Sequence, residues 1–152
     1  FLLPFLHTTL EDSMLPAERL LLEITETALI HNMTAASRLL KEMRHAGCTV
    51  ALDDFGSGLS SFAYLKQFPV DYLKIDGSFI RNLADNVVDR EIVSSINDIG
   101  HRLGVRTVAE WVEDEATLRV LRAIGVDYAQ GYAIGRPMPI EIFLEICENA
   151  DT

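Results

Sequence analysis

The stretch TVALDDFG, residues 49–56, is an apolar run that ends in two adjacent aspartates. Four further apolar runs also end in a polar or charged group: LLLEITE (20–26), YLKID (72–76), RTVAE (106–110) and YAQGY (128–132). A buried strand has no reason of its own to finish in a carboxylate, a lysine or a glutamine. Parallel strands whose carboxyl ends meet at one pocket do have that reason. The residues predicted to share such a site are Glu23, Asp53, Asp54, Lys74, Glu110 and Gln130.

The expected strands alternate with helical patterns almost to the end of the chain. Helices are expected near 1–13, 32–46, 60–67, 89–103, 114–124 and 140–148, and strands near 20–25, 48–53, 71–75, 105–109 and 127–130. The strands are continuous apolar runs, which is typical of strands buried on both faces of a parallel sheet. An open doubly wound sheet and a barrel both fit this order. Functional residues at the ends of five strands, without a glycine-rich nucleotide fingerprint after any of them, favour a barrel. Five strands are too few to close one, so we predict an α/β fold that is an incomplete (β/α)8 TIM-type barrel.

Composition limits the classes of partner. The chain has 152 residues, enough for one domain with a core, and carries a net charge of −10, which opposes nonspecific binding to DNA, RNA or anionic lipid. No apolar run is long enough to insert directly into a membrane. The two cysteines, Cys48 and Cys147, do not suggest a disulfide framework. We therefore expect a reduced, cytoplasmic setting, with any membrane tether supplied by other domains.

The adjacent carboxylates of Asp53 and Asp54 predict a cation site. In a strand the two side chains point to opposite faces, but both can turn toward the pocket as the chain enters the loop at Gly56. Like charges so close repel each other unless a cation lies between them. Oxygen ligands without clustered histidine or cysteine favour magnesium or manganese, with Glu23 and Glu110 as further ligands. The alternative is that one aspartate caps the next helix.

The other candidates also admit structural roles. Lys74 lies between apolar residues, where its ammonium group could orient a water molecule or stabilise charge on a phosphate, or simply form an ion pair with Asp76. Glu26 lies beyond its strand and is expected to tether a loop or cap a helix. Gln130 is a neutral hydrogen-bonding group at the end of the last strand, and Glu110 is the clearest strand-end carboxylate.

The motifs LLLEITE, ALDDFGSGLSS, YLKID, TVAEWVE and YAQGY–GRPMP, in this order, resemble the EAL domain family of cyclic di-GMP phosphodiesterases. The resemblance implies a modified TIM barrel that hydrolyses cyclic di-GMP to pGpG with two magnesium or manganese ions. The metal-site acids implied by the motifs are Glu23, Asp53, Asp54 and Glu110. By the same resemblance, Lys74 holds the catalytic water and acts with Glu110. Glu26 anchors the loop after a barrel strand, and Gln130 belongs to the substrate pocket.

Two departures from the family pattern bear on activity. No Glu-Ala-Leu motif precedes residue 20, so residues 1–152 are expected to be a single partial EAL domain without its N-terminal strands. Such a chain is expected to be inactive alone, or to form a homodimer or strand-exchanged assembly that covers its sheet edges. The second departure is Trp111, where the family usually has glycine; its indole could narrow the pocket, stack on guanine or pack outward. A cyclic di-GMP receptor or scaffold without turnover is therefore the alternative function.

Overall fold

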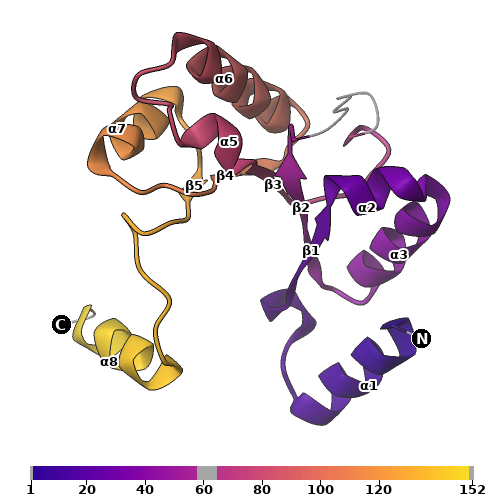
Figure 1. Ribbon diagram of the computed structural model, residues 1–152. Helices are drawn as coiled ribbons and strands as arrows, with labels where there is room; N and C mark the ends of the chain where they lie inside the picture. Colours follow the sequence, from indigo (N-terminus) through magenta and orange to yellow (C-terminus); the bar gives the residue numbers. More distant parts are fainter. Residues whose placement is uncertain (1, 58–64, 151–152) are drawn as a thin grey trace.

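A computed structural model of the protein describes residues 2–57 and 65–150 (Figure 1). The elements, in order, are α1 (Leu2–Ser13), η1 (Ala17–Arg19), β1 (Leu21–Thr25), α2 (Glu26–His31), α3 (Met33–His45), β2 (Thr49–Phe55), β3 (Tyr72–Ile75), α5 (Gly77–Ile80), α6 (Val87–Arg102), β4 (Arg106–Ala109), α7 (Glu115–Ile124), β5 (Tyr128–Ala129) and α8 (Ile140–Ala150). The helix expected near 60–67 falls mostly outside the described residues. All five expected strands are present, and the α/β prediction is confirmed.

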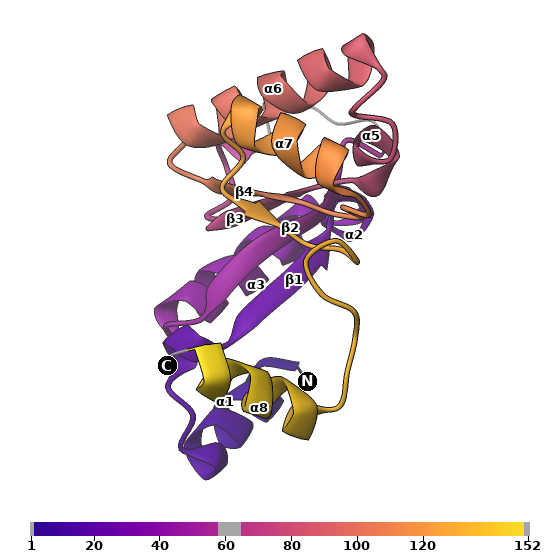
Figure 2. The same cartoon turned by 90° about the vertical axis from the view of Figure 1, so that its left-hand side faces the viewer.

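The strands form one parallel sheet in the order β1-β2-β3-β4-β5, so each strand pairs with its neighbours in sequence. This order places all carboxyl ends at the same edge. Helices α2 and α3 pack beside β1 and β2, while α6 covers β3 and β4 and contacts α7 (Figures 1 and 2). The sheet with its outer helices therefore has the (β/α) arrangement predicted from the sequence.

The core lies between the sheet and these helices. Strand residues on this face are fully buried, among them Val50, Leu52, Leu73 and Ile75. The opposite face carries a hollow of about 310 Å³, which contains Glu23, Lys74 and Gln130. Its remaining lining residues are Leu21, Ala51, Tyr72, Val108, Tyr128 and Ala129. Because side chains alternate between the faces of a strand, the apolar residues face the helices and the strand-end polar groups face the hollow.

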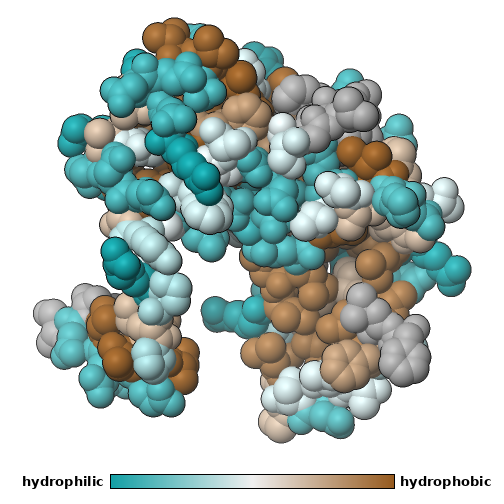
Figure 3. All heavy atoms as spheres, in the orientation of Figure 1, coloured by the Kyte–Doolittle hydropathy of each residue, from teal (hydrophilic) through white to brown (hydrophobic). Residues whose placement is uncertain are grey.

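Helix α8 lies apart from this core, whereas α1 packs against it through Leu3, Leu6 and Leu10 and contacts α3. In Figure 1, α8 lies at the end of the segment 131–139, away from the sheet, and α1 lies below β1. Apolar side chains are exposed on α8, including Ile142, Phe143 and Ile146, and Figure 3 shows this apolar surface at the lower left. Among the described residues, no helix is both long and apolar enough to cross a membrane.

Short polar motifs fix the ends of the helices. The side chain of Asn86 accepts hydrogen bonds from the backbone N–H of Val88 and Asp89 at the start of α6. Asp114 caps α7 through the N–H of Thr117, and α7 ends at Gly125, whose φ of 88° is favoured only in glycine. The last residue of helix α7 is thus Ile124, as predicted for the helix near 114–124.

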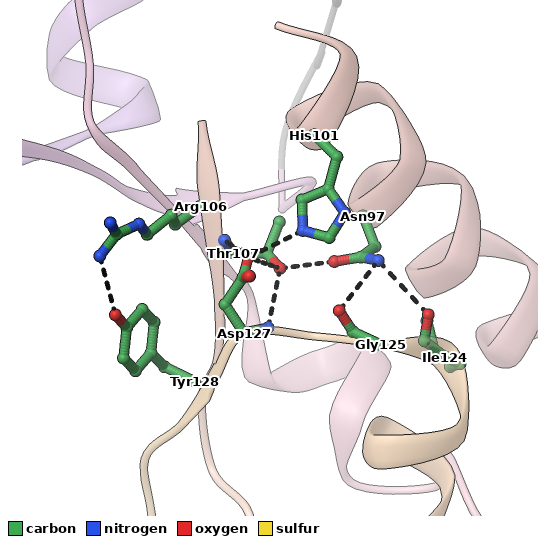
Figure 4. A network of polar contacts seen from close by, with 8 residues as sticks. All are labelled: Asn97, His101, Arg106, Thr107, Ile124, Gly125, Asp127 and Tyr128. Atoms are coloured by element: carbon green, nitrogen blue, oxygen red, sulfur yellow. Dashed lines mark hydrogen bonds and ion pairs between the residues drawn. The ribbon is translucent and has the colours of Figure 1, made fainter. Parts of the chain in front are cut away.

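A polar network joins α6, β4 and the start of β5 (Figure 4). The buried Thr107 hydroxyl bonds Asn97 Oδ1 at 2.5 Å, and the Asn97 amide donates to the carbonyls of Ile124 and Gly125. Asp127 Oδ2 accepts the Thr107 backbone N–H at 2.7 Å and contacts His101 Nε2 at 2.8 Å. These bonds satisfy polar groups beneath α6. Burying the same groups without hydrogen bonds would lower the stability of the fold.

Replacing Asp127 by asparagine is expected to lower the free energy of unfolding at neutral pH by about 1 kcal/mol, because its charge-assisted hydrogen bonds are partly exposed to solvent. Burial acts to raise the pKa of Asp127, but hydrogen bonds from Thr107 and His101 outweigh it and lower the pKa. A carboxyl group with a lowered pKa stabilises the fold at pH values above its ordinary pKa, which is near 4. This stabilisation is lost as the pH falls through the pKa of the folded state. Urea unfolding at pH 7 and below pH 4 measures this, with exposed Asp98→Asn as control. A difference that does not shrink in acid contradicts the assignment.

Candidate active site

Lys74 lies at the centre of the carboxyl edge of the sheet. Its side chain projects from β3 into the hollow, and the residue is only 5% exposed. Its Nζ lies 3.0 Å from Glu23 Oε1, 2.8 Å from Asp53 Oδ1 and 2.9 Å from Glu110 Oε1. One buried ammonium group thus joins carboxylates from β1, from β2 and from the residue after β4.

The alternative ion pair between Lys74 and Asp76 does not form. Strand β3 ends at Ile75, and the Asp76 carboxylate instead caps α5 by accepting the Ser78 backbone N–H at 2.8 Å. Burial disfavours the charged form of Lys74, but hydrogen bonds to Asp53, Glu110 and Glu23 outweigh it and raise the pKa of Lys74. Lys74 therefore stays charged and acts as a hydrogen-bond donor, not as a base.

A break in the β2–β3 pairing brings both aspartates to the same side. The register shifts between Leu52 and Phe55, and Asp54 has a φ of 55°, in the left-handed region that aspartate tolerates better than most residues. As a result, carboxylate oxygens of Asp53, Asp54 and Glu110 all lie within 4.8 Å of one another. The expectation that both side chains turn toward the pocket therefore has a backbone cause.

The clustered carboxylates alter one another's titration. Burial and the neighbouring Asp53 carboxylate raise the pKa of Asp54. Burial also raises the pKa of Glu110, and its hydrogen bond to Lys74 offsets this only in part. Burial is the largest cause of both shifts, and the negative charge of Asp53 adds to each of them.

The described residues fit a divalent cation. Asp53, Asp54 and Glu110 form the group that could hold it, through hard oxygen ligands without histidine or cysteine. Asp53 Oδ1 is buried and lies 2.8 Å from the Lys74 ammonium, its ion-pair partner. Glu23 contacts Lys74 but stands outside this group of three, so its place among the ligands stays a prediction.

Glu26 and Gln130 lie on either side of this cluster. Glu26 is the first residue of α2, almost fully buried, and its Oε2 accepts the backbone N–H of Gly56 at 3.0 Å. It thereby ties the residue after β2 to the start of α2. Gln130 follows β5 and lines both the hollow and a second cavity.

The second cavity, of about 240 Å³, lies beside Glu110. Its walls are Glu110, Trp111, Glu113, Gln130, Gly131 and Tyr132. Trp111 thus lines the pocket, and it contacts Arg81, whose guanidinium carbon lies 4.3 Å from the ring centroid. The sequence reasoning singled out Trp111 but missed Arg81 and Tyr132, although Tyr132 belongs to the quoted stretch YAQGY.

Gly131 controls how the two walls of this cavity meet. A Cβ atom at this position would lie 2.3 Å from the Val112 carbonyl oxygen. Gly131→Ala is therefore expected to lower the free energy of unfolding by about 3 kcal/mol, the upper end for overpacking, because the obstacle is backbone. Gly135→Ala, where nothing lies within 4 Å, is the matched control and should change it by less than about 0.5 kcal/mol. Chemical denaturation compares them, and equal effects would contradict the close approach.

With this geometry in place, comparison with known proteins identifies the family. The family model for the EAL domain matches residues 2–137. The chain belongs to the EAL domain family. This EAL chain is 47% identical over 138 residues to cyclic di-GMP phosphodiesterase PdeB of Shewanella oneidensis, a match that covers 91% of this chain and 16% of PdeB.

Solved EAL structures have the same fold. The PaMucR phosphodiesterase, in complex with cyclic di-GMP, matches with a TM-score of 0.85 and 39% identity over 90% of this chain and 56% of that one. The calcium and cyclic di-GMP complex of Klebsiella pneumoniae BlrP1 matches with a TM-score of 0.81 and 32% identity over 86% of this chain and 33% of that one. The EAL chain described here therefore spans less than two thirds of each of these proteins. The resemblance predicted from the strand-end motifs is confirmed.

Proposed function

We propose that the protein carrying this EAL chain hydrolyses cyclic di-GMP to the linear dinucleotide pGpG. The observation that carries the proposal is the buried Lys74, held by three carboxylates from separate strands next to the Asp53–Asp54–Glu110 group. A structural ion pair needs one carboxylate, whereas this edge gathers three around one lysine and places Asp54 beside them. The phosphodiesterase named among its relatives gives the substrate class.

The proposed cofactor is magnesium or manganese at two positions. Asp53, Asp54 and Glu110 would hold one ion, and Glu23 would contribute to the pair. When bound, these cations would neutralise charge on the phosphodiester and lower the pKa of the attacking water. They would also offset the net charge of −10, which otherwise repels an anionic substrate.

The chain's own groups would then handle the water and its proton. Burial raises the pKa of Glu110, which accepts the proton of the attacking water. The Lys74 ammonium orients Glu110 and the water. The water oxygen bonds to phosphorus while the bond between phosphorus and the ribose 3′ oxygen breaks. The 3′ oxygen leaves as a hydroxyl group after taking up a proton from solvent water, which gives pGpG. The Gln130 amide would hydrogen-bond the substrate at the rim of the pocket.

The test is a product-resolved assay of the full-length protein with manganese or magnesium. Cyclic di-GMP should be converted to pGpG, chelation should stop the reaction, and cyclic di-AMP should be turned over far more slowly. Conversion of cyclic di-GMP without any metal dependence would contradict the proposed chemistry. Binding of cyclic di-GMP without pGpG formation would leave a different function.

That different function, a cyclic di-GMP receptor without turnover, is the second candidate. It is favoured by Trp111, a large ring that lines the cavity beside Glu110. A Trp111→Gly variant distinguishes the two readings in the same assay. If the ring blocks productive binding, the variant gains turnover that the wild-type protein lacks.

We also propose that residues 1–152 alone are inactive or assemble as a homodimer or strand-exchanged pair. Within the described part of the chain, β1 and β5 each pair along one edge only. Unpaired parallel edges invite pairing with another chain. Light scattering and the hydrolysis assay on the isolated chain test this; a monomer as active as the full-length protein would contradict it.

A further inference from the structure

The short helix α5 contacts both of the segments that carry the clustered carboxylates. A Cβ atom at Gly56, in the segment after β2, would lie 2.6 Å from Cε2 of Phe79 in α5. A Cβ atom at Gly77, the first residue of α5, would overlap Cδ1 of Trp111, the residue after Glu110. Two close approaches, each possible only because a glycine is present, thus join α5 to the segment after β2 and to the segment after β4.

Gly56 is restrained by two elements besides its own strand. Its backbone N–H donates to Oε2 of Glu26, the first residue of α2, at 3.0 Å. The Phe79 ring occupies the space into which a side chain at Gly56 would project. The φ of Gly56 is 100°, a value that glycine adopts without strain. Contacts from α2 and from α5 therefore fix the backbone at this point.

The position of Gly56 is tied to the conformation of Asp54. A tight turn joins Asp54 to Ser57, because the Asp54 carbonyl accepts the Ser57 hydroxyl at 2.8 Å and the Ser57 N–H at 3.3 Å. Asp54 itself has a φ of 55°. A residue other than glycine stays in the left-handed region only where the surrounding structure holds it there. Restraint of Gly56, inside this turn, therefore also restrains Asp54.

The Phe79 ring is a contact that the loop can lose without loss of the core. Phe79 packs against the core but is only partly buried. The ring also borders a hollow of about 370 Å³, whose lining includes Gly56, Val88 and Ile92. Truncating the ring would enlarge this hollow next to Gly56 and remove the contact from α5, while the fully buried strand residues keep their packing.

We propose that Phe79 is a positioning residue for the candidate cation site. Its ring holds the backbone at Gly56, and the turn carries this restraint to Asp54, whose carboxylate would share the ion. Phe79 is not one of the clustered carboxylates, so it acts through the backbone of another segment. The use of this ion in hydrolysis rests on the proposed function, whereas the restraint of the loop does not. The competing interpretation, that Phe79 only fills space, predicts a manganese affinity that does not depend on the ring.

The test compares manganese binding by three forms of the full-length protein: wild type, Phe79→Ala and Phe68→Ala. Phe68 is the matched control, because it is a buried core ring that precedes β3 at the opposite edge of the sheet. Calorimetry without substrate should show affinity reduced about tenfold in Phe79→Ala, the low end for losing a residue that orients a metal ligand, and less than about twofold in Phe68→Ala. If an alanine variant fails to fold, leucine at the same two positions replaces it, with a loss of about threefold expected for Phe79→Leu alone. Wild-type affinity in the folded Phe79 variant, or an equal loss in the Phe68 variant, would overturn the proposal.

Turnover provides a readout that a purely structural defect would not give. If Phe79 acts on the affinity for the ion, Phe79→Ala should hydrolyse cyclic di-GMP slowly at limiting manganese and at nearly the wild-type rate at saturating manganese. A rate that is equally low at both concentrations would contradict a positioning role.

Hydrogen exchange of the metal-free protein separates this proposal from the proposed function. The peptide that contains Gly56 should exchange about tenfold faster in Phe79→Ala, because local opening no longer breaks the contact with α5. The peptide that contains Gly125, whose N–H bonds the Leu121 carbonyl in α7, should be unchanged. Faster exchange at Gly56 with weaker manganese binding, but without hydrolysis by the wild-type protein, would sustain the positioning role while the proposed function fails. Hydrolysis by the wild-type protein, with exchange at Gly56 unchanged in Phe79→Ala, would overturn the positioning role and leave the function standing.

Discussion

Replacing Lys74 by methionine is expected to lower the rate of cyclic di-GMP hydrolysis by a factor of about 10² to 10⁴. Methionine keeps most of the apolar length of the side chain but removes the charge that joins Glu23, Asp53 and Glu110. Without it, Glu110 and the attacking water lose their common donor. The rate is measured at saturating manganese, so that a weaker metal affinity is not mistaken for a slower step.

The same variant should also lose stability when free of metal. Removing one partner of a buried ion pair typically costs about 3–5 kcal/mol, because the remaining charges are left uncompensated. Manganese should restore much of this loss, since a bound cation replaces the lost positive charge. Lys66→Met, at an exposed lysine, is the matched control and should change neither rate nor stability. A Lys74→Met protein with the wild-type rate would remove Lys74 from the mechanism.

Replacing Asp54 by asparagine is expected to weaken manganese binding by about 10- to 100-fold, and turnover at limiting manganese should fall in parallel. The magnitude is that of losing a group on which a metal site depends. Asparagine tolerates the φ of 55° found at Asp54, so the backbone is kept while one negative charge is lost. Isothermal titration with manganese measures the affinity directly.

The same substitution is expected to have an effect of opposite sign on the stability of the metal-free fold. The raised pKa of Asp54 shows that its charge is unfavourable in the absence of a cation, so Asp54→Asn should be neutral or stabilising without metal. Exposed Asp85→Asn controls for the loss of one negative charge elsewhere. If Asp54→Asn binds manganese as tightly as the wild-type protein, Asp54 is not a ligand.

The strand ends could be predicted from the sequence because burial on both faces leaves few reasons for a terminal charge. The runs that end at Asp53, Lys74 and Glu110 placed these residues at one edge, and parallel pairing brings that edge together. The family motifs also indicated the reaction, which is hydrolysis of cyclic di-GMP. Both inferences depend on patterns that repeat along the chain.

The arrangement within the edge could not be predicted in the same way. The register shift before Phe55 and the left-handed Asp54 come from tertiary pairing with β3, which leaves no periodic signal. Whether Lys74 pairs with Asp76 or with three carboxylates more distant in sequence depends on where β3 ends. Strand ends are difficult to locate from sequence. The Thr107–Asn97–Asp127 network likewise joins residues from separate elements.

The most direct measurement is a manganese anomalous difference map from crystals of the full-length protein. The account predicts a peak in contact with carboxylate oxygens of Asp53, Asp54 and Glu110, at distances of about 2.0–2.2 Å, the range for small hard divalent cations. The peak should disappear in Asp54→Asn crystals soaked at the same concentration. A manganese peak elsewhere in an active protein, with Lys74 still bound to Glu23, Asp53 and Glu110, would contradict the assignment of this edge as the metal-dependent site.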